Sequence, residues 1–340
     1  MNGINFDRQE SKMKNIFLIL ALCLSLIQCS YEKLPVYNLV KSKQVDVIVD
    51  TLFLHDIKCL TFYDEKLYFS NPVYDQIISL NKNLEFERIF GRKGKGPNEL
   101  LGINQFAIHD SLISVLNVSN RRVNVFLTSG ISASETLIGN SILFDPSYRY
   151  CFMDTTIIGC SSIAETPLSK YNIYTKKQTL FGKTYEFPTP KQTLIRNNRF
   201  TAKIDNKLIV VSNNLPYIEI YNQDSLEQIV QYDYSSILQV QRSLRAIEKK
   251  PDQEDNSYRH LCEDIYVTNR HLYILLIDYS NNDFNVNQII KFEVFPVIKP
   301  ISVYNLPGKY YTTFCVSEED GVVYAYHYTD NTLGTYLINK

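Results

Sequence analysis

The stretch FGRKGKGPNEL, residues 90–100, contains three glycines, three basic residues and an acid, the composition of a phosphate-binding loop. A P-loop requires GxxxxGK followed by Ser or Thr, and Gly91 and Gly96 have that glycine spacing. However, Pro97 and Asn98 stand where the phosphate-binding lysine and the magnesium-binding hydroxyl belong. We therefore do not expect this stretch to bind phosphate.

Other residue types that carry chemistry do not form a recognisable catalytic or metal-binding pattern. The chain has five histidines, which are His55, His109, His260, His271 and His327. None of them has an HxxxH spacing, no GxSxG nucleophile motif occurs, and no CxxC pair suggests zinc. We predict no catalytic residue and no metal ligand from these motifs.

Acids and amides recur at the starts of predicted strands, at Asp64, Asn104, Asp110, Asp205 and Asp264. Carboxylate and amide oxygens are the ligands that hard divalent cations prefer. The same residue types are also the common turn formers, since they tolerate left-handed backbone and bond their own main chain. We favour turns for these positions.

The elements that position these residues form a repeat. Each copy has an apolar strand, a polar turn and a second alternating strand. The six copies span Glu65–Phe90, Asp110–Gly130, Thr155–Gly182, Asn206–Tyr232, Arg270–Phe295 and Asp320–Asn339. A repeat of this length, rich in short strands, is typical of a β-propeller blade. We therefore predict an all-β chain folded as a six-bladed β-propeller, with a β-sandwich or two smaller β domains as the alternative.

The last copy ends almost at Lys340 and leaves little room for an outermost strand. The segment QVDVIVDTLF, Gln44–Phe53, alternates well and has no partner in the first copy. We predict that this N-terminal strand completes the last blade and closes the ring. The propeller would then cover residues 44–340, and residues 30–43 would be a linker.

In such a ring, residues 90–100 connect the outermost strand of one blade to the innermost strand of the next. Glycine permits a sharp turn there, and Glu99 can accept backbone N–H bonds. The stretch resembles the G-x-x-G-x-GPGEF phrase of six-bladed propellers of the NHL-like and TolB-like type, common in exported Bacteroidetes proteins. The matching positions are Gly91, Gly94, Gly96, Pro97 and Glu99. The resemblance implies a six-bladed ring in the cell envelope and brings no established reaction with it.

The N-terminus is typical of a targeting segment. Lys12 and Lys14 precede the apolar run Ile16–Ile27, which is shorter than the roughly 20 residues that span a bilayer. The run ends in LIQCS, which resembles a bacterial lipobox with Cys29 as the lipidated residue. We predict a lipoprotein signal over residues 1–29 and an outer-membrane lipoprotein, periplasmic or surface-facing, that contacts the membrane through its lipid alone. A plain secretory signal or a buried N-terminal helix stays as an alternative.

The formal net charge of −1 gives no global attraction to nucleic acid, and we expect no nucleic-acid partner. We predict a non-catalytic protein that uses one propeller face to bind an envelope protein, a peptide or a glycan, without a cofactor. A possible binding face carries the basic residues Arg92, Lys93, Lys95, Arg121 and Arg122. The alternative is a metal-dependent hydrolase or lyase resembling lactonase-type propellers, with a divalent metal held at the central channel by oxygen ligands from at least three blades.

Overall fold

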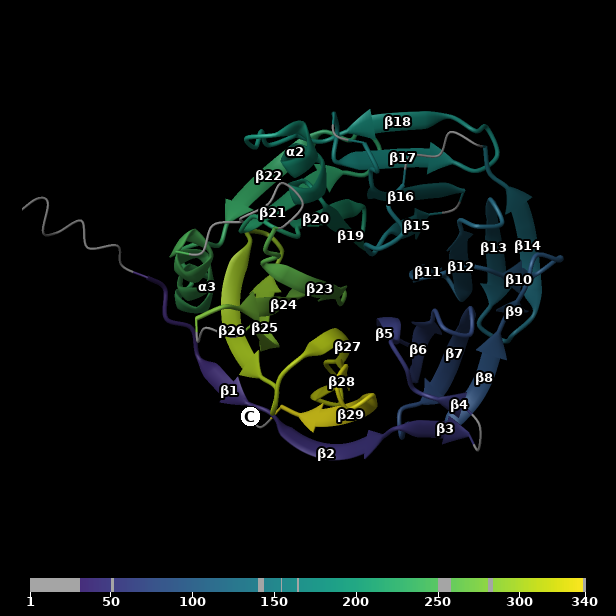
Figure 1. The fold of residues 1–340 in the computed structure, drawn as a ribbon, viewed down its shortest axis with the longest axis horizontal. Coiled ribbons are helices and arrows are strands. Elements are labelled where there is room, and N and C mark those ends of the chain that lie inside the picture. The colour runs from purple at the N-terminus through teal and green to yellow at the C-terminus, as the bar shows by residue number, and fades with distance from the viewer. Residues whose placement is uncertain are drawn as a thin grey trace, which may run out of the picture.

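Six small sheets stand around a central axis as the blades of a propeller (Figure 1). This computed structural model describes residues 31–49, 52–139, 144–153, 155–163, 165–249, 258–280 and 284–338. The predicted six-bladed all-β fold is confirmed. The predicted signal segment, including Cys29, lies outside the described residues.

Each blade is an antiparallel meander whose first strand is innermost. Blade 1 consists of β5 (Lys58–Tyr63), β6 (Lys66–Asn71), β7 (Gln76–Asn81) and β8 (Phe86–Phe90). Blade 2 consists of β11 (Phe106–His109), β12 (Leu112–Asn117), β13 (Arg122–Leu127) and β14 (Ser132–Leu137). Blade 3 consists of β15 (Cys151–Met153), β16 (Thr156–Cys160), β17 (Leu168–Asn172) and β18 (Gln178–Phe181). Blade 4 consists of β19 (Arg199–Ile204), β20 (Lys207–Ser212), β21 (Tyr217–Asn222) and β22 (Gln228–Asp233). Blade 5 contains β23 (Cys262–Val267), β24 (His271–Asp278), β25 (Asn285–Glu293) and β26 (Lys299–Asn305). Blade 6 contains β27 (Tyr311–Ser317), β28 (Val322–His327) and β29 (Thr332–Leu337).

In blades 1, 2 and 4, the turns between the first and second strands are tight because their residues tolerate left-handed backbone. In blade 1, Tyr63 pairs with Lys66, so Asp64 and Glu65 form a two-residue turn with φ of 50° and 58°. Asp110 and Asp205 take φ of 47° and 51° at the same place in blades 2 and 4. Positive φ at the first position is what hairpin turns of this kind require, and Asp accepts it. The prediction that these three acids are turn formers is confirmed.

The ring closes through the N-terminal segment, but not with the residues predicted. The closing strand is β2 (Val40–Val45), antiparallel to β29 with Val40 opposite Leu337. Only Gln44 and Val45 of the predicted segment take part. β3 (Val47–Val49) and β4 (Leu52–Phe53) pair with each other instead.

Much of the expected linker also takes part in the propeller, from Val36 onward. Its β1 (Val36–Asn38) adds a parallel fifth strand to blade 5 beside β26. The prediction missed both strands because their side chains are almost all exposed, so the sequence VKSKQV has no apolar alternation to reveal it.

Aromatic contacts join most neighbouring blades, which explains the abundance of Tyr and Phe. The pairs are Phe90–Phe126 between blades 1 and 2, Tyr148–Phe200 and Phe181–Tyr221 between 3 and 4, Tyr232–Phe292 between 4 and 5, Tyr266–Phe314 between 5 and 6, and Phe62–Tyr324 between 6 and 1. Ring centroids in these pairs lie 5.2 to 6.4 Å apart, a distance at which edge and offset contacts are favourable. Flat side chains therefore fill the wedge between adjacent sheets.

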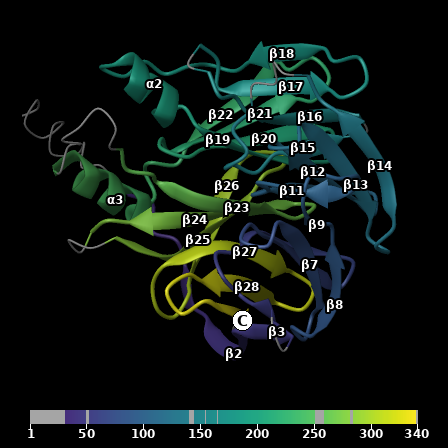
Figure 2. The same ribbon diagram turned by 45° about the vertical axis from the view of Figure 1, so that its right-hand side comes forward.

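Two helices interrupt the blade rhythm between blades 3 and 4 and between blades 4 and 5. They are α2 (Pro190–Arg196), whose N-cap Thr189 accepts a bond from the Gln192 N–H, and α3 (Leu238–Lys249). Both project beyond the blades on the same side of the ring (Figure 2). Within the described residues, neither helix has the length and apolarity to cross a membrane. Cys59, Cys151, Cys160, Cys262 and Cys315 are buried free thiols.

Candidate functional site

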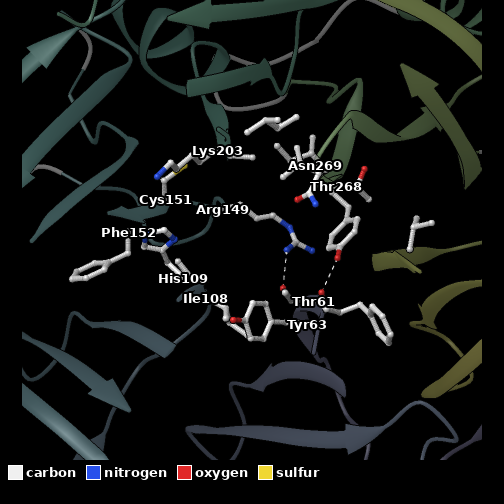
Figure 3. Close-up of a pocket in the computed structure, with 18 of the residues that line it drawn as sticks. Thr61, Tyr63, Ile108, His109, Arg149, Cys151, Phe152, Lys203, Thr268 and Asn269 are labelled. Carbon is white, nitrogen blue, oxygen red and sulfur yellow. Dashed lines mark hydrogen bonds between the residues drawn. The ribbon is translucent and has the colours of Figure 1, made fainter. Parts of the chain in front are cut away.

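The central channel opens into two cavities, one at each end of the inner strands. The larger, of about 750 Å³, is the "larger mouth" and is lined by the residues at the ends of all six inner strands: Thr61–Glu65, Phe106–His109, Arg149–Phe152, Thr201–Asp205, Ile265–Arg270 and Val316–Glu319 (Figure 3). The "smaller mouth", of about 300 Å³, lies where the inner strands begin.

A buried ion pair separates the two mouths. The Arg149 guanidinium donates from Nε to Asp264 Oδ1 over 2.6 Å and from Nη2 to Asp264 Oδ2 over 2.7 Å. This two-point geometry is the strong form of an Arg–carboxylate contact. Figure 3 shows the Arg149 side chain extended into the centre of the channel toward Thr61. Arg149 comes from blade 3 and Asp264 from blade 5, so the pair crosses the axis.

Arg149 also donates to blades 1 and 6, and its contact with blade 6 runs from Nη2 to Thr313 Oγ1 over 3.2 Å. Nη2 also donates to the Leu60 carbonyl over 2.9 Å, and Nη1 lies 3.4 Å from Thr61 Oγ1. Thr313 of blade 6 donates from Oγ1 to Asp264 Oδ2 over 2.8 Å. Burial lowers the pKa of Arg149, but the charge of Asp264, the hydrogen bond to it and the nearby thiols of Cys59 and Cys315 together outweigh burial and raise the pKa overall. The guanidinium therefore stays charged, and four blades are joined at the axis.

Above this pair, the larger mouth is acidic on balance. Its lining carries the carboxylates of Asp64, Glu65, Asp205, Glu318 and Glu319. The cationic side chains in the same lining are Lys203 and Arg270, since the charge of Arg149 is matched by Asp264. An excess of negative charge in the lining makes the electrostatic potential in the opening negative.

Two of the five carboxylates already have partners. Glu65 accepts from Lys82 Nζ over 2.6 Å. Glu318 pairs with Lys291 over 3.1 Å and accepts from Tyr273. Burial opposes ionisation of Glu318, but these hydrogen bonds lower its pKa overall.

The other three carboxylates, Asp64, Asp205 and Glu319, are exposed at the rim. They come from turns of blades 1, 4 and 6, and blades 1 and 4 lie on opposite sides of the ring. Negative charge therefore surrounds the opening on several sides.

The glycine-rich stretch is a closed turn at the outer edge of the ring, away from both mouths. Glu99 Oε2 accepts the Gly96 N–H over 2.6 Å, which lowers the pKa of Glu99, and Oε1 pairs with Arg92 Nε over 2.9 Å. Gly94 has φ of 156°, and Pro97 is exposed in the same loop. Short strands β9 (Arg92–Lys93) and β10 (Glu99–Leu100) pair across it.

The predicted basic face lies at the same outer edge, and none of its five residues lines either mouth. Arg92 pairs with Glu99, Lys93 with Asp75 over 3.4 Å and Arg122 with Glu135 over 2.8 Å. Lys95 and Arg121 are exposed nearby. Three of the five basic side chains therefore form ion pairs within the fold.

The predicted oxygen residues separate into three places. Asp64 and Asp205 lie at the larger mouth, Asn104 and Asp264 line the smaller mouth, and Asp110 lies in the turn beside His109. Among the residues that the structure describes, no three His, Cys, Asp or Glu side chains come together as a metal-binding group.

Sequence reasoning missed Arg149, the residue at the centre of the channel. It precedes β15 in the segment SYRYC, which carries no motif.

No family model and no curated protein matches the chain. Two solved structures resemble it in fold. A member of the DUF4221 family from Bacteroides vulgatus has 13% identity and a TM-score of 0.58, with 89% of this chain and 98% of that chain covered. A Bacteroides fragilis protein provisionally described as exported has 11% identity and a TM-score of 0.56, with 91% and 100% covered. At such identities the likeness concerns the fold alone, and it extends over nearly the whole six-bladed ring.

Proposed function

We propose that the chain is an exported binding protein whose larger mouth holds a basic segment of a protein partner in the cell envelope. The observation that carries this proposal is the acidic balance of the mouth: Glu65 and Glu318 pair with Lys82 and Lys291, and the rim still carries Asp64, Asp205 and Glu319 against Lys203 and Arg270. The Arg149–Asp264 pair forms a floor without net charge. A lysine or arginine side chain entering the mouth meets an attractive field along its path.

The lining also suits the aliphatic part of a long basic side chain. Tyr63, Ile108 and Phe152 line the mouth between the charged positions. Lys and Arg stems pack on such surfaces while their charged ends reach carboxylates, and a cation can lie over a tyrosine ring. The spread of the rim acids over separate blades favours an extended segment over a compact ion.

Two features support an envelope location. The lipobox-like sequence ending at Cys29 suggests an outer-membrane lipid anchor, and the similar Bacteroides fragilis protein is provisionally described as exported. We accordingly place the ring in the envelope, attached through lipid, as a non-catalytic binding protein.

The test is calorimetric titration with two synthetic peptides of equal length, one lysine-rich and one glutamate-rich. We expect the lysine-rich peptide to bind at least about ten-fold more tightly, a difference of about 1.4 kcal/mol, and to weaken as salt is added. The triple variant Asp64→Asn, Asp205→Asn and Glu319→Gln should lose most of this preference. Asn keeps the left-handed turns intact, so the fold is preserved.

The matched control removes three exposed carboxylates that line neither mouth: Asp224→Asn, Glu227→Gln and Glu248→Gln. It changes the net charge by the same amount and should keep the preference for the lysine-rich peptide. Equal loss in the control and the triple variant, or tighter binding of the glutamate-rich peptide, would contradict the proposal.

A further inference from the structure

The smaller mouth has the features of a second, independent binding site. It is lined by Lys58, Cys59, Asn104, Gln105, Ser147, Tyr148, Phe200, Asn213, His260, Glu263, Asp264, Thr312 and Thr313. The Arg149–Asp264 pair separates it from the larger mouth, so its occupant is not the segment proposed above. Its volume of about 300 Å³ is at the small end of the range for ligand pockets.

Two buried oxygens in this pocket lack hydrogen-bond partners among the described residues. Gln105 is 7% exposed, and its Nε2 donates to the Ser147 carbonyl over 3.2 Å while its Oε1 has no donor. Thr312 Oγ1 is buried and unpartnered in the same lining. An unmet buried acceptor costs about 1–3 kcal/mol, so a group that donates hydrogen bonds to it is stabilising.

The charges in the pocket are largely compensated. Asp264 is paired with Arg149, and Lys58 Nζ lies 2.9 Å from Asp56 Oδ1. Burial lowers the pKa of His260 to about 4, so its ring is neutral near pH 7. Burial also raises the pKa of Glu263 to about 7, so this carboxyl carries a proton for much of the time. Little net charge is left to select an ion.

One wall of the pocket is aromatic and held in place. The rings of Tyr148 and Phe200 meet edge to face with centroids 5.2 Å apart. The Tyr148 hydroxyl accepts from Asn198 Nδ2 over 2.7 Å, which fixes the ring. The pocket thus has an apolar surface beside the unpartnered oxygens of Gln105 and Thr312.

We propose that the smaller mouth binds an uncharged, hydroxyl-rich ligand of about the size of a monosaccharide. Its hydroxyls donate to Gln105 Oε1 and Glu263, while its carbon-bound hydrogens pack on the Tyr148 and Phe200 wall. An apolar ligand would leave the Gln105 oxygen unpaired, and an ion would enter a pocket whose charges are already matched.

The test is titration of the propeller with glucose, galactose, mannose and N-acetylglucosamine, followed by ligand-observed NMR. Protonated glucosamine and glucuronate serve as charged analogues. We expect at least one neutral sugar to bind saturably and more tightly than either charged analogue. Gln105→Leu should weaken that binding at least about ten-fold, because it removes the unpaired acceptor. Glu227→Gln, at an exposed outer turn, should leave it unchanged.

A second variant keeps the proposal testable if Gln105→Leu fails to fold. Glu263→Leu removes the other acceptor that the proposal assigns to the ligand, so we expect it also to weaken binding of the same sugar at least about ten-fold. Absence of binding for all four sugars up to about 10 mM, or tighter binding of a charged analogue, would overturn the proposal. The peptide experiment probes the other mouth, so either proposal can fail without the other.

Discussion

At the scale of single residues, the axis of the ring depends on one buried ion pair. The side chains of Arg149 and Asp264 are 10% and 6% exposed, so each charge relies on the other for the stabilisation that water would otherwise give. Removing one partner of such a pair leaves an uncompensated buried charge, which typically costs about 3–5 kcal/mol, whereas replacing both is far less costly.

We therefore expect Arg149→Met to lower the free energy of unfolding by about 3–5 kcal/mol. The double variant Arg149→Met, Asp264→Asn should recover a large part of that loss, because the orphan carboxylate is gone. Urea unfolding of the two variants and the unchanged protein measures both values. A double variant no more stable than Arg149→Met would show that the ion pair is not what the single substitution disturbs.

Glu263 makes the stability of the smaller mouth depend on pH. Burial raises its pKa from the usual 4.5 to about 7, Asp264 adds to this and Lys58 opposes it. The carboxyl holds its proton more tightly in the folded state than in the unfolded state. Its contribution to stability is therefore complete below about pH 4.5 and is lost as the pH rises through about 7.

The difference in unfolding free energy between the unchanged protein and Glu263→Gln should fall steadily over that interval and level off above it. His260, in the same pocket, has the opposite dependence, since its pKa is lowered to about 4. Because His260 is present in both proteins, its contribution cancels in the difference between their unfolding free energies. Urea unfolding at a series of pH values gives the curve, and a pH-independent difference would show that Glu263 ionises normally.

At the scale of elements, local signals decided what could be predicted. Period-two strands and Asp-led turns are encoded within a few residues, so blade number and the turns at Asp64, Asp110 and Asp205 were accessible from the sequence. The β2 strand was not, because its side chains are exposed and its partner β29 lies at the other end of the chain. Arg149 was not, because Asp264 is 115 residues away.

In the inter-blade turn, residues 90–100, the sequence predicts the sharp turn of the backbone but not the partners of the basic side chains. Its glycines fold the loop back on Glu99, and a Cβ at Gly94 would overlap Glu99 Oε2. Its basic residues point to the outer edge and largely to acidic neighbours, which no pattern in the sequence revealed.

Gly94→Ala should destabilise the protein more than Gly321→Ala. Both positions have positive φ, for which a Cβ costs about 1–2 kcal/mol, but among the described residues nothing lies within 4 Å of a Cβ at Gly321. At Gly94 the substitution also displaces Glu99 from the Gly96 N–H. Thermal unfolding of the two variants provides the comparison, and equal melting temperatures would mean that the loop rearranges without loss.

At the scale of the whole molecule, neither mouth exists without the closed ring. The larger mouth takes residues from all six blades, and the β1 and β2 strands cover the outer edges of blades 5 and 6. Closure protects strand edges that would otherwise pair with other chains. The acidic opening is thus a property of the assembled ring, built from turns that are far apart in the sequence.

Hydrogen exchange with and without the lysine-rich peptide tests the central claim most directly, because it locates the contact. We predict slower exchange in the turns of blades 1, 4 and 6 that carry Asp64, Asp205 and Glu319, with little change in residues 91–100. Protection confined to the outer-edge stretch 91–100, with those three turns unaffected, would contradict a binding site at the larger mouth.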